Sequence, residues 1–167
     1  MKRFFSVLLM TVFICAIPLG CSSKEEKKAA HFEKGKKYYQ QAKYEEAVIE
    51  YRNVLKIDPR FADGRYQLAL SYLKTKKLRE AFSELQKTVE LDPNNMNAQL
   101  DIGKLYLLSK DKTKAREKVE LVLGKEPKNA EAHILMGEIY VLEKELDKGI
   151  KEIKTAIELD PKQITSY

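Results

Sequence analysis

The chain of 167 residues has no tryptophan, few turn-forming residues and almost no cysteine. Its 7 glycines and 5 prolines are too few for the many turns of a β-sandwich or barrel. Its two cysteines, Cys15 and Cys21, both lie near the N-terminus. The remainder of the chain can therefore hold neither a disulfide framework nor a cysteine metal site. What it does contain is abundant Ala, Glu, Lys and Leu, which favours helix.

Long runs of a single charge sign are also missing. Lys and Arg number 31 against 25 Asp and Glu, which gives a formal net charge of +6. The two signs are interspersed along the chain rather than gathered in blocks. This pattern is typical of a solvated surface and differs from the basic patch of a nucleic-acid-binding protein. We therefore expect no nucleic-acid partner.

The N-terminal segment, residues 1–21, reads MKRFFSVLLMTVFICAIPLGC. Lys2 and Arg3 precede a largely apolar run over residues 4–17. A membrane span needs about 20 apolar residues, so this run has instead the length of a signal-peptide core. An uncleaved anchor and an ordinary cleaved signal are the alternatives. The ordinary signal is disfavoured because no A-x-A site lies near the end of the run.

The end of this segment resembles the lipobox of bacterial lipoproteins. Gly20 and Cys21 match its small residue and its cysteine, and Leu19 is acceptable. Pro18 departs from the family, which prefers an aliphatic residue at this position. The resemblance implies a signal peptide over residues 1–20 and a lipid attached to Cys21.

Lipidation would fix where the protein resides. Two or more acyl chains anchor a protein stably to a membrane, whereas one does not. We expect a lipidated Cys21 and a polar tether over residues 21–27 to hold the protein at a membrane, facing the periplasm or the outside. Ser22 is similar to the residue that follows the cysteine in lipoproteins of the outer membrane of two-membrane bacteria. That membrane is the location we expect.

Beyond residue 27 the sequence repeats every 34 residues. The period appears in four prolines, four tyrosines and two sets of small residues. These columns are Pro59, Pro93, Pro127 and Pro161; Tyr38, Tyr72, Tyr106 and Tyr140; Gly35, Ala69, Gly103 and Gly137; and Ala47, Ala81, Ala115 and Gly149. Four columns in one register indicate a structural repeat.

A 34-residue period with these columns resembles the tetratricopeptide repeat family. The resemblance covers residues 28–167 and implies an all-α fold, a right-handed α-α superhelix of four helical hairpins plus the start of a fifth. The expected repeats are 28–61, 62–95, 96–129 and 130–163, with a partial repeat at 164–167.

Each column has a mechanical reason. The two sets of small residues should face each other, since small side chains let the two helices of a hairpin approach closely. Each proline should end the second helix, because it disfavours helical geometry in the residue before it and lacks an N–H. Asn94, Asn95 and Asn129 are candidate N-caps for the helices that follow.

In the family, the first helices of the hairpins line a concave groove that binds peptides. Mapping those positions onto this chain gives candidate groove residues, for each of which a packing or surface role is the alternative. They are Phe32, Lys36, Tyr39, Tyr66, Gln67, Leu70, Lys74, Asp101, Lys104 and Glu138. Some members clamp a C-terminal carboxylate in this groove. Here only Lys36 carries a suitable charge at the matching positions, and Asp101 would repel the ligand.

No residue pattern predicts catalysis, a metal site or a cofactor. Phosphate-binding glycine loops and nucleophile motifs are absent from the sequence. His31 and His133 fall in one repeat column, three repeats apart, and are expected to substitute for the bulky residue of that column. Paired carboxylates such as Glu45 and Glu46 are expected to be solvated.

The sequence therefore predicts a scaffold that is tethered to a membrane by lipid and binds a partner protein or peptide. Related lipoproteins act in exopolysaccharide export, protein sorting and pilus assembly, and the sequence does not choose among them. An alternative is the N-terminal adaptor part of a longer enzyme. A third alternative is a repeat protein that self-associates end to end through an uncapped face.

Overall fold

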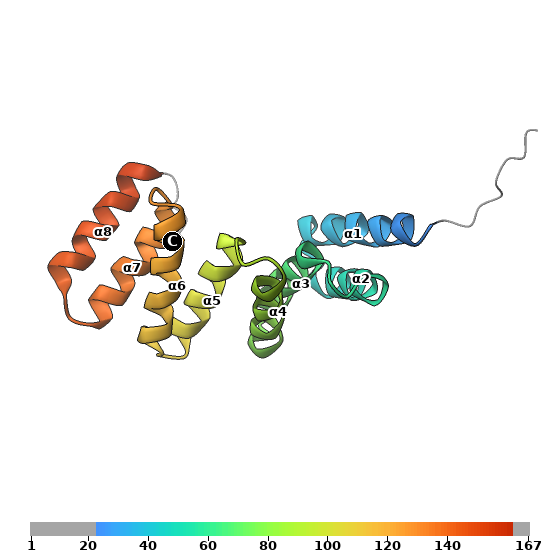
Figure 1. The fold of residues 1–167 in the computed structure, drawn as a ribbon, viewed down its shortest axis with the longest axis horizontal. Helices are drawn as coiled ribbons and strands as arrows, with labels where there is room; N and C mark the ends of the chain where they lie inside the picture. The colour runs from blue at the N-terminus through green and yellow to red at the C-terminus, as the bar shows by residue number, and fades with distance from the viewer. Residues whose placement is uncertain (1–22, 162–167) are drawn as a thin grey trace, which may run out of the picture.

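The computed structural model describes residues 23–161, which form eight α-helices and no strand (Figure 1). The helices are α1 (Lys24–Gln40), α2 (Tyr44–Ile57), α3 (Ala62–Lys74), α4 (Leu78–Leu91), α5 (Met96–Leu108), α6 (Lys112–Lys125), α7 (Ala130–Leu142) and α8 (Leu146–Leu159). The predicted all-α fold is confirmed. The expected signal peptide over residues 1–20, Cys21, and the expected partial repeat at 164–167 lie outside the described residues.

The helices form four hairpins that stack side by side. Each odd-numbered helix packs against the helix that follows it, and each hairpin packs against the next (Figure 1). In addition, α1 contacts α3 and α5 contacts α7, whereas within residues 23–161 no two even-numbered helices touch to the same extent. The odd-numbered helices therefore line the inner side of the curved stack, and the even-numbered helices form its outer side.

The same three-residue turn joins the two helices of every hairpin. Its middle residue has a positive φ in each case, and none of the four is glycine. They are Ala42, Lys76, Lys110 and Lys144, with φ between 56 and 64°. The residue after each donates its backbone N–H over 2.9 Å to the carbonyl of the tyrosine column. This 6→1 hydrogen bond is that of a Schellman motif, which satisfies a helix-end carbonyl.

The prolines and asparagines mark the junctions between hairpins. The second helix of each hairpin ends two residues before its proline, at Ile57, Leu91, Lys125 and Leu159. Asn95 and Asn129 cap α5 and α7, as predicted, by accepting the backbone N–H of Ala98 and Ala132 over 2.9 Å. Asn94 is not a cap, because it lies in the turn and donates its backbone N–H to Asp92.

The columns of small residues are buried, as predicted. A Cβ built on Gly137 would lie 3.2 Å from the carbonyl oxygen of Gly149, so these two glycines do face each other. At the first crossing the nearest neighbour of Gly35 is the ring of Tyr51, at 2.7 Å from an added Cβ. The small residue of α1 therefore makes room for an aromatic ring.

Helix α1 begins earlier than the first repeat was expected to. Ser23 caps it with a capping box, in which the Ser23 hydroxyl accepts the backbone N–H of Glu26 and the Glu26 carboxylate accepts the backbone N–H of Ser23. Both bonds satisfy groups that a helix start leaves unpaired. Residues 24–27, expected to belong to a polar tether, are helical.

Candidate functional site

The inner side of the stack holds two open pockets, one at each end of the row of odd-numbered helices. The pocket between α1 and α3 has a volume of about 610 Å³ and the one between α5 and α7 about 290 Å³. Three of the predicted groove residues line the first pocket, and two line the second. We call them the repeat 1–2 pocket and the repeat 3–4 pocket, and together the inner groove.

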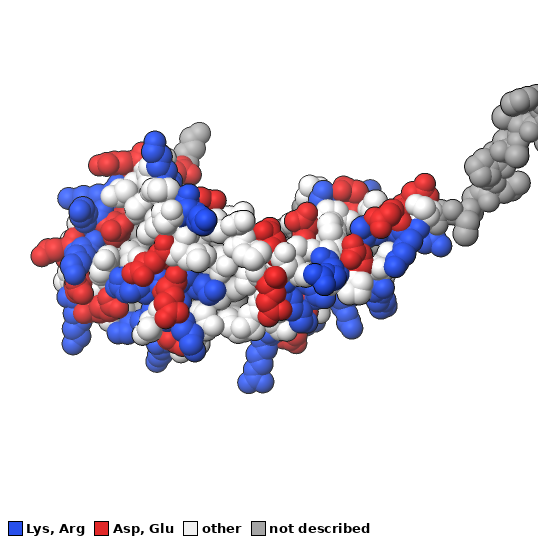
Figure 2. All heavy atoms as spheres, in the orientation of Figure 1, with Lys and Arg blue, Asp and Glu red and all other residues white. Residues whose placement is uncertain are grey.

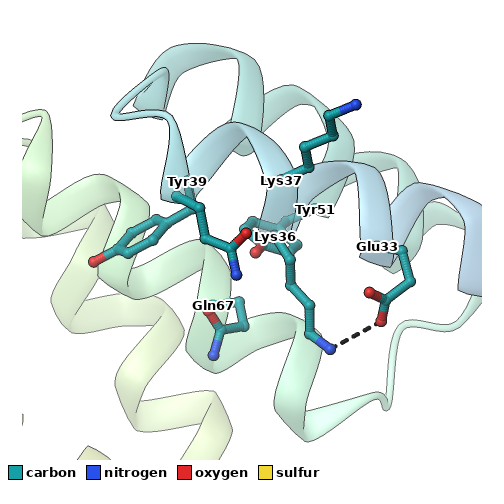
Figure 3. Close-up of a pocket in the computed structure, with 7 residues that line it drawn as sticks. Glu33, Lys36, Lys37, Tyr39, Tyr51 and Gln67 are labelled. Atoms are coloured by element: carbon teal, nitrogen blue, oxygen red, sulfur yellow. Dashed lines mark hydrogen bonds and ion pairs between the residues drawn. The ribbon is translucent and has the colours of Figure 1, made fainter.

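The repeat 1–2 pocket combines amide, phenol and charged side chains (Figure 3). Its lining consists of Glu33, Lys36, Lys37, Tyr39, Gln40, Tyr51 and Gln67. Lys36 and Glu33 form an ion pair of 2.8 Å, and Lys37 points away from the pocket in Figure 3. Tyr51 comes from α2, and its ring reaches the inner side past Gly35. Tyr51 was not among the predicted groove residues, because those were taken from the first helix of each hairpin and Tyr51 lies on the second.

Tyr51 differs from the other lining residues in its burial. Its side chain is fully buried, and its hydroxyl has no hydrogen-bond partner within residues 23–161. Burial raises the pKa of Tyr51 to about 12, with a smaller contribution from Tyr39 and Glu33. The hydroxyl therefore stays protonated at physiological pH and remains a hydrogen-bond donor.

A polar network joins α3, α5 and α7 on the inner side of the stack. The Tyr66 hydroxyl donates to Asp101 over 3.1 Å, and the Lys104 ammonium lies 2.9 Å from Asp101 and 2.7 Å from Glu131. Burial, followed by the charge of Asp101, raises the pKa of Tyr66. Burial alone would lower the pKa of Lys104, but its two carboxylate partners outweigh burial and raise it. Tyr66, Asp101 and Lys104 therefore hold adjacent hairpins together.

The repeat 3–4 pocket has an apolar floor and an acidic edge. Its lining consists of Lys104, Leu107, Leu108, Glu131, Ile134, Leu135 and Glu138. Glu138 has no ion-pair partner within 4 Å among residues 23–161. Partial burial raises the pKa of Glu138, although the charge of Lys104 acts in the opposite direction. A cation placed beside Glu138 would find its carboxylate unoccupied.

Five predicted groove residues line neither pocket, and one of them, Tyr66, belongs to the polar network described above. Phe32 packs edge-on against Phe61 and near Tyr51, in the hydrophobic cluster of the first hairpin. Asp101 is buried, and its carboxylate is used within the network. Leu70 is half-buried and Lys74 exposed, and neither is among the residues that line the two pockets.

The histidines belong to a polar pair that recurs in every hairpin. Each pair joins residues 19 apart on the two helices, at 2.6–2.8 Å. The pairs are His31–Glu50, Arg65–Glu84, Gln99–Lys118 and His133–Glu152. The histidines thus hold the two helices of a hairpin together as well as fill space. The sequence did carry the signal, because both columns keep the 34-residue interval.

Residues 23–161 offer neither a cluster of metal ligands nor a membrane-spanning helix. This region contains no group of three or more His, Cys, Asp or Glu side chains placed to hold a metal ion. None of its helices has both the length and the apolar character that a membrane crossing requires. Glu45 and Glu46 are exposed on α2, as predicted.

Comparisons with known proteins were made on the sequence and on the fold. Tetratricopeptide repeat families match residues 35–76, 66–125 and 130–163. A search of curated proteins gave no match.

Solved structures share the fold at low sequence identity. MamA (residues 41 to the end) from Desulfovibrio magneticus RS-1 aligns with a TM-score of 0.75 and 23% identity, over 83% of this chain and 78% of that one. Pseudomonas aeruginosa PilF gives 0.71 and 20%, over 83% and 63%. YrrB, described as a TPR protein with an unusual peptide-binding site, gives 0.70 and 23%, over 80% and 69%. The repeat matches and these folds agree: the chain is a tetratricopeptide repeat protein.

Proposed function

We propose that this protein is a scaffold that binds a partner protein or peptide in its inner groove while a lipid on Cys21 tethers it to a membrane of the bacterial envelope. The main observation in favour of binding in the inner groove is the pair of open pockets on the odd-numbered helices. Support also comes from the family, whose members bind proteins or peptides, and from YrrB, which is described as having a peptide-binding site.

The chemistry of the groove suits a polypeptide. Its pockets offer amide and phenol groups at one end and aliphatic side chains with free carboxylate at the other. A polypeptide carries matching hydrogen-bonding groups, apolar side chains and charges, and protein interfaces combine all three. Acidic and basic side chains are interspersed over the face drawn in Figure 2, which does not form the single-sign surface that nucleic acid requires.

The groove is tested by affinity capture from the envelope, with the lipidated chain as bait. Lys36→Glu combined with Glu138→Lys reverses one charge in each pocket and leaves the buried Asp101 with its partners. The matched control, Lys154→Glu with Glu117→Lys, makes the same two exchanges at exposed positions on the outer helices α8 and α6. We expect a captured partner to be lost from the groove variant and kept by the control. Equal capture by both would place binding elsewhere.

The tether is tested separately. Cys21 lies outside the described residues, and the proposal of lipidation rests on its resemblance to a lipobox. We expect Cys21→Ser to move the protein from the membrane fraction to the soluble envelope fraction, because the variant cannot receive the acyl chains. Radiolabelled palmitate should be incorporated only into the wild type. A Cys21→Ser protein that stays at the membrane to the same extent would show another anchor.

A further inference from the structure

We propose that the Tyr51 hydroxyl is the hydrogen-bond donor of a binding site, in the repeat 1–2 pocket, for the uncharged main chain of an extended polypeptide. The inference rests on the proposed function and makes it more specific, since it names the pocket, the donor and the chemical group that is bound.

The first observation is that the hydroxyl is buried without a partner. Tyr51 is 0% exposed, and within the described residues its hydroxyl forms no hydrogen bond. Native proteins satisfy the great majority of buried polar atoms, because an unpaired one keeps its desolvation cost without compensation. Tyr51 also lines an open pocket, so an acceptor from outside the chain can reach the hydroxyl once the side chains that cover it move aside.

The second observation comes from the other repeats. The residues one, two and three periods after Tyr51 are Leu85, Val119 and Ile153. Leu85 and Val119 are fully buried in the same position on the outer helix. Packing between the helices of a hairpin therefore requires an apolar body at this position but no hydroxyl. In the first hairpin the hydroxyl is an addition, and the residue that carries it lines the pocket.

The neighbours of Tyr51 indicate what kind of acceptor fits. The side chains of Gln40 and Gln67 line the same pocket and, within residues 23–161, make no hydrogen bond of their own. A side-chain amide has both donors and an acceptor, which is the complement of a peptide group. The Lys36 ammonium is already paired with Glu33 at 2.8 Å, and the Lys37 side chain points out of the pocket in Figure 3, so among residues 23–161 neither lysine of the lining is placed to hold a carboxylate inside it.

The ligand must also present a free carbonyl. In an α-helix the main-chain carbonyls are bonded within the helix, whereas an extended segment leaves them available. The pocket lies between α1 and α3 and draws its amides from both helices (Figure 3). An extended segment lying across these helices would place a carbonyl at Tyr51 after the surface side chains of Lys36 and Gln40 move aside.

The test is a titration of the full chain, in detergent micelles, followed by two-dimensional amide NMR. The probe is the neutral peptide acetyl-Gly-Ser-Gly-Ser-Gly amide, compared with its acidic counterpart, acetyl-Gly-Glu-Gly-Glu-Gly amide. We expect saturable shifts for Gly35 and Gln67 at millimolar concentrations of the neutral peptide. No saturation with this probe, or clearly tighter binding of the acidic one, would overturn the proposal.

Two variants separate the hydroxyl from the ring. Tyr51→Phe keeps the ring against Gly35 and is expected to weaken binding of the neutral peptide about fivefold, the effect of one net hydrogen bond. It should not lower the unfolding temperature, since it removes an unpaired buried hydroxyl. Tyr72→Phe is the matched control: Tyr72 packs against the same cluster but lines an outer pocket, and binding should not change.

The remaining outcomes are equally decisive. Gln67→Leu should also weaken binding, and it tests the site independently at a half-exposed position. Unchanged affinity in Tyr51→Phe would refute the role of the hydroxyl. If affinity capture still depended on Lys36 and Glu138 in that case, the groove would stand as a binding surface and only the inference about Tyr51 would fail.

Discussion

In the first hairpin, α1 crosses α2 with Gly35 against the rigid ring of Tyr51, whereas in the last, α7 crosses α8 with Gly137 against the flexible end of Ile153. The ring reaches the inner groove, and the isoleucine does not line either of its pockets. The same repeat position therefore serves packing alone in the last hairpin and packing plus a donor in the first. Repeated helices can thus differ in function where one column exchanges an aliphatic side chain for an aromatic one.

Substituting the two glycines should give the largest difference. A methyl group at Gly35 would lie 2.7 Å from the Tyr51 ring, which cannot yield without moving α2. At Gly137 it would lie 2.8 Å from Ile153 Cδ1 and 2.9 Å from Cγ1, in a side chain that can change rotamer, and 3.2 Å from the carbonyl oxygen of Gly149. We expect Gly35→Ala to lower the free energy of unfolding by about 2 kcal/mol through overpacking. Gly137→Ala should change it by less than about 1 kcal/mol, because helix propensity offsets the remaining crowding.

Urea unfolding of both variants measures this difference. Equal destabilisation by Gly35→Ala and Gly137→Ala would mean that the Tyr51 ring is as free to move as the isoleucine. The position assigned to its hydroxyl would then be wrong.

The second largest difference is expected between the polar pairs of the first and last hairpins, in how much each stabilises the fold. Glu50 is buried and receives both His31 and Lys34, each at 2.6 Å, whereas Glu152 receives His133 alone. Burial would raise the pKa of Glu50, but its two partners outweigh burial and lower it below the ordinary value of 4.5. The ionised carboxylate therefore stabilises the folded state above about pH 4.5, and this contribution is lost as the pH falls through the lowered pKa.

We expect Glu50→Gln to lower the free energy of unfolding by about 1 kcal/mol at neutral pH. This is the usual effect of losing charged hydrogen bonds whose partners are partly exposed. As the pH falls from about 5 to about 3, the variant should also lose less stability than the wild type, because it has no Glu50 carboxylate to protonate. Chemical unfolding at several pH values measures both effects, with Glu152→Gln as the comparison. A steeper acid dependence in Glu50→Gln than in the wild type would contradict the assignment.

The outer faces of the end hairpins also differ. On α8, Leu146, Ile150 and Ile157 are 59%, 53% and 43% exposed, respectively, and form an apolar strip at helical spacing. On α1 the first turns are charged. If the protein self-associates through this strip, Ile150→Glu should weaken association about threefold or more, because it places a charge in an apolar contact. Light scattering over a concentration series measures the change, and Lys151→Glu, at an exposed position of the same helix away from the strip, is the control.

The repeat period predicted the helices well because each column reports a local cause. Proline prevents the preceding helix from continuing through it, and two small residues allow a close crossing in any hairpin. The contact between Tyr66 and Asp101 was not predicted, since it joins different hairpins and depends on the twist between them. For the same reason Asp101 was assigned to the groove lining, although the neighbouring hairpin buries it.

The turns between paired helices were missed for another reason. Glycine normally supplies a positive φ, yet Ala42, Lys76, Lys110 and Lys144 occupy that conformation here. The hydrogen bond to the tyrosine carbonyl, together with packing of the hairpin, holds them in it. A sequence without glycine at these positions gives no signal of the left-handed residue.

Substitutions in this turn should give the smallest effect on stability in the comparison of the first and last hairpins. Ala42 and Lys144 occupy the left-handed residue of the first and last hairpins, at φ of 56 and 63°. Glycine removes the steric cost of about 1 kcal/mol or more, but it also increases the entropy of the unfolded chain. We expect Ala42→Gly and Lys144→Gly each to raise the free energy of unfolding by about 0.5 kcal/mol. Because the turn geometry is the same at both ends, unequal changes in thermal unfolding would show that the two hairpins differ in backbone as well as in side chains.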